Sequence, residues 1–132
     1  MLRSILIVDD DASVRGLVAR ILRSWGHAVT GEAGSIAEAV TCVDALRPDV
    51  VLVDIGLPDG DGFSLARRLR AGTWPVRVVL FSSDADRANI AAARRAGAAG
   101  FFPKDELSSA ALRRLIEDDG EDDGEDEGDD GA

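Results

Sequence analysis

The stretch VVLVD at residues 50–54 is the strongest indicator of how this chain folds. Four consecutive apolar residues, three of them β-branched, predict a short strand, and the lack of alternation with polar residues predicts that both of its faces are buried. Such strands are typical of parallel sheets with helices on each side. The acid that closes the run, Asp54, would be costly to bury without a metal ion or another cation beside it.

On either side of this stretch, four further runs are predicted to be strands, at residues 5–8, 28–33, 76–81 and 98–102. Helices are expected between and after them, at residues 35–46, 62–70, 86–96 and 106–117. The first helix has the clearest apolar stripe, made of Val14, Leu17, Val18, Ile21, Leu22 and Trp25. Asp11 or Ser13 is expected to cap it and Gly26 to end it. This (βα)₅ order predicts an open, doubly wound α/β fold with a parallel sheet.

Polar residues follow several of the predicted strands. Asp9 and Asp10 follow the first, Asp54 the third, Ser82 the fourth and Lys104 the fifth. Ligands of such folds bind beyond the carboxyl ends of the strands, so these side chains are expected to share one rim. Carboxylates brought together repel one another, and their oxygens suit Mg²⁺. Acids with a hydroxyl and an ammonium also suit phosphoryl chemistry, with Asp54 as the nucleophile.

Other reactive or charged residues have simpler explanations. Lys104 is the only lysine of the chain, and a solvated loop lysine would be the usual interpretation, but the acids after the first and third strands favour a functional role. Asp59 and Asp61 are expected to be turn and cap residues. The solitary His27 and the single Cys42 are interpreted as structural or solvent-facing, without a catalytic or redox role.

Four motifs together resemble the receiver domains of bacterial response regulators over residues 1–116: ILIVDDD at 5–11, VLVDIGLPDGDGF at 51–63, VVLFSS at 78–83 and GFFPKD at 100–105. The resemblance implies a flavodoxin-like fold with strand order 2-1-3-4-5. It also implies that Asp54 accepts the phosphoryl group, that Asp10 binds Mg²⁺ directly and Asp9 through water, and that the backbone carbonyl of Gly56 completes the metal site.

The same resemblance assigns a switch. Lys104 aligns with the lysine that contacts the phosphoryl group, Ser82 with a switch hydroxyl that is more often threonine, and Phe101 with a switch aromatic that is often tyrosine. On phosphorylation Ser82 is expected to move toward Asp54 and Phe101 to turn inward, so that the face of the fourth helix, fifth strand and fifth helix changes. Pro103 before the lysine and Asp105 after it are closer to receivers of LuxR/NarL-type regulators.

The function expected is that of a stand-alone receiver, phosphorylated by a histidine kinase or a histidine phosphotransfer protein and signalling by protein contact, with dimerisation through that face as one option. It would catalyse only its own phosphoryl transfer and autodephosphorylation. The alternative is a pseudo-receiver, an interaction module that works without phosphorylation. A metal-dependent phosphohydrolase on the same fold is a weaker alternative, because Gly56 stands where a second catalytic acid would be needed.

The net charge of −10 is unevenly distributed. Residues 117–130 contain 11 acids and no Lys or Arg, whereas residues 1–116 carry 14 acids and 15 bases. We therefore expect a receiver domain at 1–116 and a disordered acidic tail at 117–132. This tail either only solubilises the chain or acts through its charge, by loosely holding Mg²⁺, by repelling acidic partners, or by folding back on the surfaces around Arg94, Arg95, Arg113 and Arg114. The anionic tail argues against nucleic-acid binding. No apolar run approaches the ~20 residues of a membrane span, and a cytoplasmic location is expected.

Overall fold

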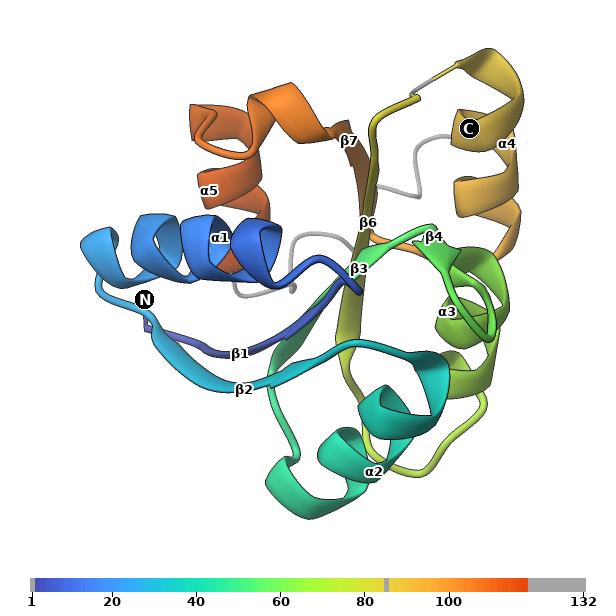
Figure 1. The fold of residues 1–132 in the computed structure, drawn as a ribbon, viewed down its shortest axis with the longest axis horizontal. Coiled ribbons are helices and arrows are strands. Elements are labelled where there is room, and N and C mark those ends of the chain that lie inside the picture. Colours follow the sequence, from blue (N-terminus) through green and yellow to red (C-terminus); the bar gives the residue numbers. More distant parts are fainter. Residues whose placement is uncertain (1, 85, 119–132) are drawn as a thin grey trace.

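The fold is a five-stranded parallel sheet between two layers of helices (Figure 1). It was obtained as a computed structural model that describes residues 2–84 and 86–118. The strand order is β2-β1-β3-β6-β7, which confirms the predicted flavodoxin-like order, since β6 and β7 are the fourth and fifth strands of the sheet. The sheet strands are β1 (Ser4–Val8), β2 (Ala28–Ala33), β3 (Val50–Asp54), β6 (Arg77–Ser82) and β7 (Gly100–Pro103).

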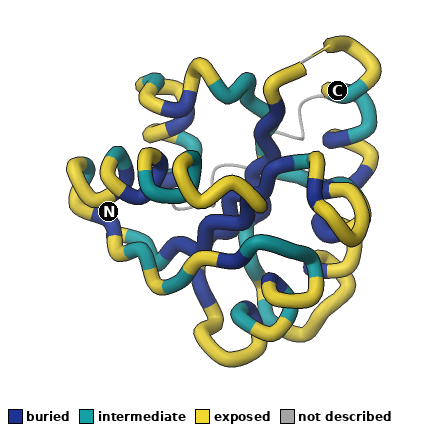
Figure 2. Tube along the Cα trace, in the orientation of Figure 1, coloured by how far each residue is buried: buried dark blue, intermediate teal, exposed yellow. Residues whose placement is uncertain are grey.

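The helices divide between the two faces of the sheet. They are α1 (Ala12–Ser24), α2 (Ile36–Leu46), α3 (Gly62–Arg70), α4 (Arg87–Arg95) and α5 (Ala110–Glu117). In Figure 1, α1 and α5 lie on one face, and α2, α3 and α4 on the other. Each face has its own apolar core, and the most buried segments run along the central strands (Figure 2). All five residues of β3 are buried, as its continuous apolar run predicts.

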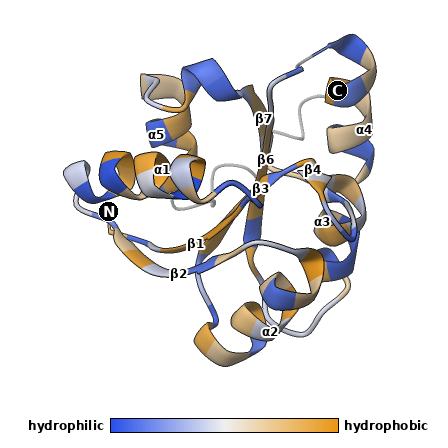
Figure 3. Ribbon diagram, in the orientation of Figure 1, coloured by the Kyte–Doolittle hydropathy of each residue, from blue (hydrophilic) through white to orange (hydrophobic). Residues whose placement is uncertain are grey.

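The hydropathy of the ribbon broadly follows this layering, with apolar segments along the central strands (Figure 3). Asp11 caps α1 by accepting a hydrogen bond from the Ser13 N–H, and Gly26 follows with φ of 91°, as expected. Leu17, however, was wrongly assigned to the buried stripe, because its exposed fraction is 47%. The face that packs on the sheet is centred near Leu22, which leaves Leu17 on the far side.

Two local predictions also need correction. In place of one helix at residues 106–117, the structure has a 3₁₀ turn, η1 (Lys104–Glu106), followed by α5. Ser109 caps the start of α5, because its side chain accepts a hydrogen bond from the Leu112 N–H. The loop after Asp54 also contains a two-stranded antiparallel hairpin, β4 (Gly56–Leu57) and β5 (Gly60–Asp61), where only a turn was expected.

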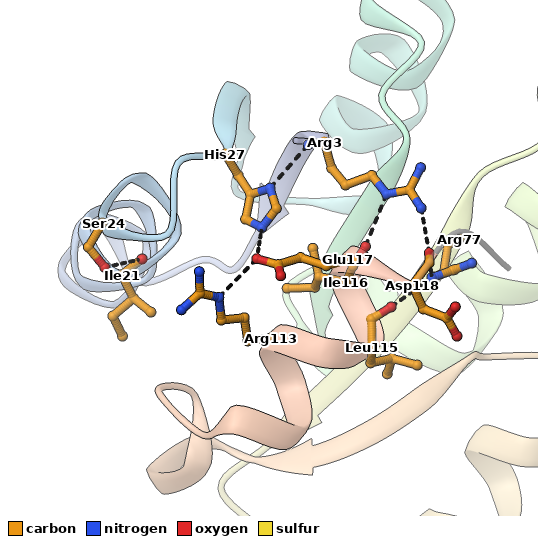
Figure 4. Close-up of polar contacts among 10 residues, drawn as sticks. All are labelled: Arg3, Ile21, Ser24, His27, Arg77, Arg113, Leu115, Ile116, Glu117 and Asp118. Carbon is orange, nitrogen blue, oxygen red and sulfur yellow. Dashed lines mark hydrogen bonds and ion pairs between the residues drawn. The ribbon is translucent and has the colours of Figure 1, made fainter. Parts of the chain in front are cut away.

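The end of α5 is joined to the opposite end of the chain (Figure 4). The buried His27 accepts a hydrogen bond at Nδ1 from the Arg3 N–H, so its Nε2 carries the proton toward Glu117 Oε2, 2.9 Å away. His27 is therefore structural. Glu117, counted in the sequence as the first tail residue, is the last residue of α5. Residues 119–132, for which disorder was expected, lie outside the described part of the chain.

Asp59 connects the loop after β3 to α2. Its carboxylate accepts from the Ile36 N–H at 2.8 Å and from the Ala37 N–H at 3.1 Å, while Asp61 caps α3 through the Ser64 N–H. The expectation of cap residues is thus confirmed, although Asp59 serves a helix more than 20 residues earlier. The hydrogen bond from Ile36, followed by that from Ala37, holds the pKa of Asp59 below its usual 3.8.

We predict that Asp59→Asn lowers the melting temperature at neutral pH. A carboxylate whose pKa is lower in the folded than in the unfolded state stabilises the fold above its unfolded pKa, and that stabilisation disappears as pH falls through the folded value. The difference in melting temperature between the wild type and Asp59→Asn should therefore shrink below about pH 3.8. Thermal melts from pH 7 to 3 measure this, with the exposed α2 variant Asp44→Asn as control. A difference independent of pH would contradict the charge argument.

Candidate functional site

The acidic residues lie where the sheet reverses its winding direction. β1 continues into Asp9 and Asp10, and the neighbouring β3 ends with Asp54. From β1 the chain winds to β2 on one side, whereas β3 and the later strands lie on the other. The carboxyl ends of strands at such a switch point form a crevice, because the connecting helices leave to opposite faces. The topology therefore brings together acids that are 44 residues apart in sequence.

The three carboxylates form one cluster. Asp9, Asp10 and Asp54 each offer an oxygen, and these oxygens all lie within 4.8 Å of one another. Asp9 and Asp54 are buried, and Asp10 is exposed. Asp9 Oδ1 accepts a hydrogen bond from the Asp11 N–H, which leaves Asp9 Oδ2 buried without a well-oriented hydrogen bond to any described residue. A buried carboxylate oxygen of this kind is suited to bind a cation.

Lys104 supplies positive charge to the cluster. Its Nζ lies 3.0 Å from Asp9 Oδ2 and 3.3 Å from Asp54 Oδ2, although its angle to Asp9 falls short of good hydrogen-bond geometry. The ammonium also lies 5.6 Å from the centre of the buried Phe81 ring. Burial by itself would lower the pKa of Lys104, but Asp9 and Asp54 outweigh it and raise the pKa above 10.5. Lys104 is therefore positively charged throughout the physiological range.

Asp54 has an unfavourable environment for its own charge. Its exposed fraction is only 7%, and burial, followed by repulsion from Asp9, raises the pKa of Asp54 above its usual 3.8. Lys104 and the Gly56 N–H act in the opposite direction and lower it in part. The carboxylate is held in an electrostatically strained state that an additional cation would relieve.

Ser82 and Phe101 lie in the last two strands of the sheet and make different contacts. Ser82 ends β6, is buried, and accepts a hydrogen bond at Oγ from the Asp84 N–H at 2.9 Å. Phe101 lies in β7, is half-buried, and packs against the core on the α2–α3–α4 face. Gly56 is exposed in β4, two residues after Asp54, with open space around the position of a Cβ.

Two residues that the sequence interpretation did not single out shape the site. Phe81, which pairs with Asp54 in the β3–β6 register, places its ring beneath the Lys104 ammonium. Gly62 begins α3, and a Cβ there would lie 2.8 Å from both the Asp54 carbonyl oxygen and the Ile55 Cα. The burial of Phe81 follows from its apolar strand, but the contact of Gly62 with another segment has no signal in the local sequence.

Comparison with known proteins identifies related molecules. The sequence model of one protein family, the response regulator receiver domain, matches residues 5–117. The DNA-binding transcriptional activator DevR/DosR of Mycobacterium tuberculosis is 37% identical over 120 residues, which cover 91% of this chain and 55% of that protein. The chain thus spans about half the length of this curated relative.

Solved structures agree with the sequence matches. The signal receiver domain of the putative response regulator NarL from Mycobacterium tuberculosis has a TM-score of 0.78 at 35% identity, covering 86% of this chain and 95% of that one. A two-component response regulator of the LuxR family from Aurantimonas sp. SI85-9A1 has a TM-score of 0.77 at 31% identity, covering 87% and 86%. These matches confirm the expected closeness to receivers of LuxR/NarL-type regulators.

Proposed function

This chain belongs to the response regulator receiver family of two-component systems, and on that premise we propose that it accepts a phosphoryl group on Asp54 and signals through protein contacts. The observation that carries the proposal is the buried Asp54 carboxylate, which lies 3.3 Å from the Lys104 ammonium and within 4.8 Å of two further carboxylates. Such a site can present a nucleophilic oxygen and neutralise the charge of a transferring phosphoryl group.

The residues present fit a divalent metal ion. Asp9, Asp10 and Asp54 offer hard oxygen ligands, and the buried Asp9 Oδ2 lacks a well-oriented hydrogen bond to any described residue. We propose that Mg²⁺ is held by these carboxylates and by the Gly56 carbonyl. When bound, it would neutralise the charge of the three acids and of the incoming phosphoryl oxygens.

In the proposed reaction an Asp54 carboxylate oxygen attacks phosphorus, the bond from phosphorus to the donor's imidazole nitrogen breaks, and an acyl phosphate forms. The donor nitrogen keeps the electron pair of the broken bond. Lys104, already 3.3 Å from Asp54, would stay close enough to pair with a phosphoryl oxygen. The chain would then act on its own modification, including autodephosphorylation, rather than turn over a separate substrate.

The proposed readout uses Ser82 and Phe101. Phosphorylation adds roughly −1.5 to −2 charge and three acceptor oxygens, which would draw the Ser82 hydroxyl away from the Asp84 N–H. Phe101, packed on the α2–α3–α4 side, would turn into the space released. Because Phe101 carries no hydroxyl, the α4–β7–α5 face would change through packing alone. An unchanged environment of Phe101 after phosphorylation would contradict this switch.

The partners proposed are a histidine kinase or a histidine phosphotransfer protein upstream and a protein target downstream, in the cytoplasm, with dimerisation through the α4–β7–α5 face as one form of output. The acidic composition of residues 117–130 is unfavourable for binding a nucleic-acid backbone and supports a protein as the downstream target. The relative DevR/DosR is described as DNA-binding, and that property is not transferred to this chain. Among the described residues, none of the helices is long and apolar enough to span a membrane.

The experiment that tests the function is intact-mass analysis after incubation with acetyl phosphate. A single phosphoryl adduct is expected with Mg²⁺ present and none with EDTA. If no adduct forms although Mg²⁺ binds and the fold is intact, the phosphorylation-independent interaction module becomes the better explanation.

We predict that Mg²⁺ raises the melting temperature of the wild type and that Asp10→Asn greatly reduces this rise. A ligand that binds only the folded state stabilises it by an amount that grows with the logarithm of its concentration. Asp10 is exposed, so its replacement should leave the core intact. Thermal melts from zero to several millimolar Mg²⁺ measure the effect, with Asp44→Asn as control. An equal rise in wild type and Asp10→Asn would remove Asp10 from the proposed ligands.

A further inference from the structure

A basic depression lies at the edge of the sheet opposite the acidic cluster. Its volume is about 680 Å³, and it is formed at the amino-terminal ends of β3, β6 and β7, beside the end of α3. Three arginines line it, Arg3, Arg70 and Arg77, together with the Trp74 ring. Its place at the amino-terminal ends of these strands separates it from the proposed phosphorylation site.

Arginines outnumber acids three to one among the described residues that line this depression. Asp49 is the one acid among the lining residues, and its carboxylate already accepts hydrogen bonds from the Ser4 N–H and hydroxyl. Within residues 2–84 and 86–118, the hydrogen bond of Arg70 goes to a backbone carbonyl, that of Gly97, which brings no full negative charge. A further arginine, Arg47, lies over the Trp74 ring at 5.3 Å. An anionic partner would therefore be attracted to this edge of the sheet.

The described chain ends at the rim of the same depression. Arg3 donates to the carbonyl oxygens of Ile116 and Asp118, and Arg77 donates to those of Leu115 and Asp118, at 2.6 and 2.8 Å (Figure 4). Two of the arginines that line the depression thus also hold the last residues of α5 and the residue after it. Residue 119 follows directly from this point.

The segment that follows is complementary in charge. Residues 119–132 contain nine acids and no Lys or Arg. At about 3.3–3.6 Å per extended residue, this segment can reach up to about 50 Å from the point where it is tethered. Because the segment is tethered at the rim, its effective concentration there is on the order of millimolar, which makes even weak ion pairs populated.

We propose that the acidic residues 119–132 dock in the depression lined by Arg3, Arg70, Arg77 and Trp74. The arginines of α4 and α5 that the sequence suggested as partners are less suitable. Arg113 is paired with Glu117 at 3.0 Å, and Arg94, Arg95 and Arg114 lie on exposed helix surfaces outside the depression. Docking at this edge leaves the acidic cluster accessible. Docking is therefore compatible with phosphorylation of Asp54 and does not depend on that phosphorylation.

The proposal is tested by paramagnetic relaxation in the full chain. A nitroxide is attached at Gly124→Cys in a Cys42→Ala background, and the broadening of backbone amide and Trp74 indole signals is recorded by NMR. Signals of Gly97, Ala98, Ala99 and the Trp74 indole are expected to broaden most. The broadening should fall at least about twofold between 20 mM and 300 mM NaCl, because salt screens ion pairs at the surface.

A matched pair of variants separates this site from general attraction. Arg70→Gln should reduce the broadening at Gly97–Ala99 at least about twofold, whereas Arg68→Gln, in the same last turn of α3 but outside the depression, should not. Replacing the nine acids of residues 119–132 by Asn and Gln should abolish the broadening at Gly97–Ala99. Broadening centred on α4 or α5, or equal effects of Arg70→Gln and Arg68→Gln, would overturn the proposal.

Discussion

Asp54→Asn is expected to eliminate the phosphoryl adduct that acetyl phosphate forms on the wild-type chain. Asparagine keeps the size of the side chain but has no carboxylate oxygen to attack phosphorus, so the reaction loses its nucleophile. Intact-mass analysis in the presence of Mg²⁺ measures the result. Asp44→Asn, which removes an exposed acid from α2, should retain the full adduct. An adduct of undiminished yield in Asp54→Asn would place the acceptor elsewhere and reject the proposed function.

The same substitution should make the metal-free protein more stable. Burial and the charge of Asp9 raise the pKa of Asp54, which means that its charged form is less favourable in the folded than in the unfolded chain. Between the unfolded and the folded pKa, stability rises as pH falls, and at neutral pH the full destabilisation remains. In EDTA at pH 7, the melting temperature of Asp54→Asn should therefore exceed that of the wild type. A decrease would show that the Lys104 contact outweighs the burial of the charge.

Gly62→Ala is expected to destabilise the fold by roughly 1–3 kcal/mol, the usual cost of overpacking. The added Cβ would lie 2.8 Å from the Asp54 carbonyl oxygen and 2.8 Å from the Ile55 Cα, both of them backbone atoms that cannot turn aside. Either α3 or the backbone that carries Asp54 must move. Urea denaturation measures the loss of stability, and the rate of adduct formation should fall as well.

Gly16→Ala is the matched control for this substitution. Gly16 lies within α1, and a Cβ at this position meets nothing within 4 Å. Alanine should therefore stabilise the protein by about 0.4–1 kcal/mol, because it restricts the unfolded chain and favours helix. Opposite signs for the two Gly→Ala substitutions would demonstrate the steric origin of the Gly62 effect. Stabilisation by both would show that the start of α3 can shift without cost.

Much of the fold was predictable because its signals are local. The continuous apolar run before Asp54 predicts a strand buried on both faces, and Asp11 and Gly26 mark the ends of the first helix. Predictions of burial were wrong where the apolar spacing of a helix does not settle which of its faces packs on the sheet. Leu17 follows the apolar spacing of α1 yet is exposed, because the orientation of the helix on the sheet, rather than its spacing, selects the buried face.

The candidate site was predictable to a similar degree. Asp54 and Ser82 end their strands, Asp9, Asp10 and Lys104 follow theirs, and the carboxyl ends of parallel strands must share one edge. The sequence does not reveal the distances within the cluster, the buried Asp9 oxygen, or the Phe81 ring beneath the lysine. Those depend on how the strands are placed against one another.

The sequence by itself determined the element order, the parallel sheet and the residues brought to its carboxyl edge, because periodicity and position after a strand are properties of short segments. Only the tertiary structure decided that Asp59 caps α2, that Arg3 and Arg77 hold the end of α5, and that Gly62 must lack a side chain. The physical reason is that these contacts join separate elements of the fold, and Arg3 and Asp118 among them are 115 residues apart. Their partners are specified by packing in three dimensions and by no pattern along the chain.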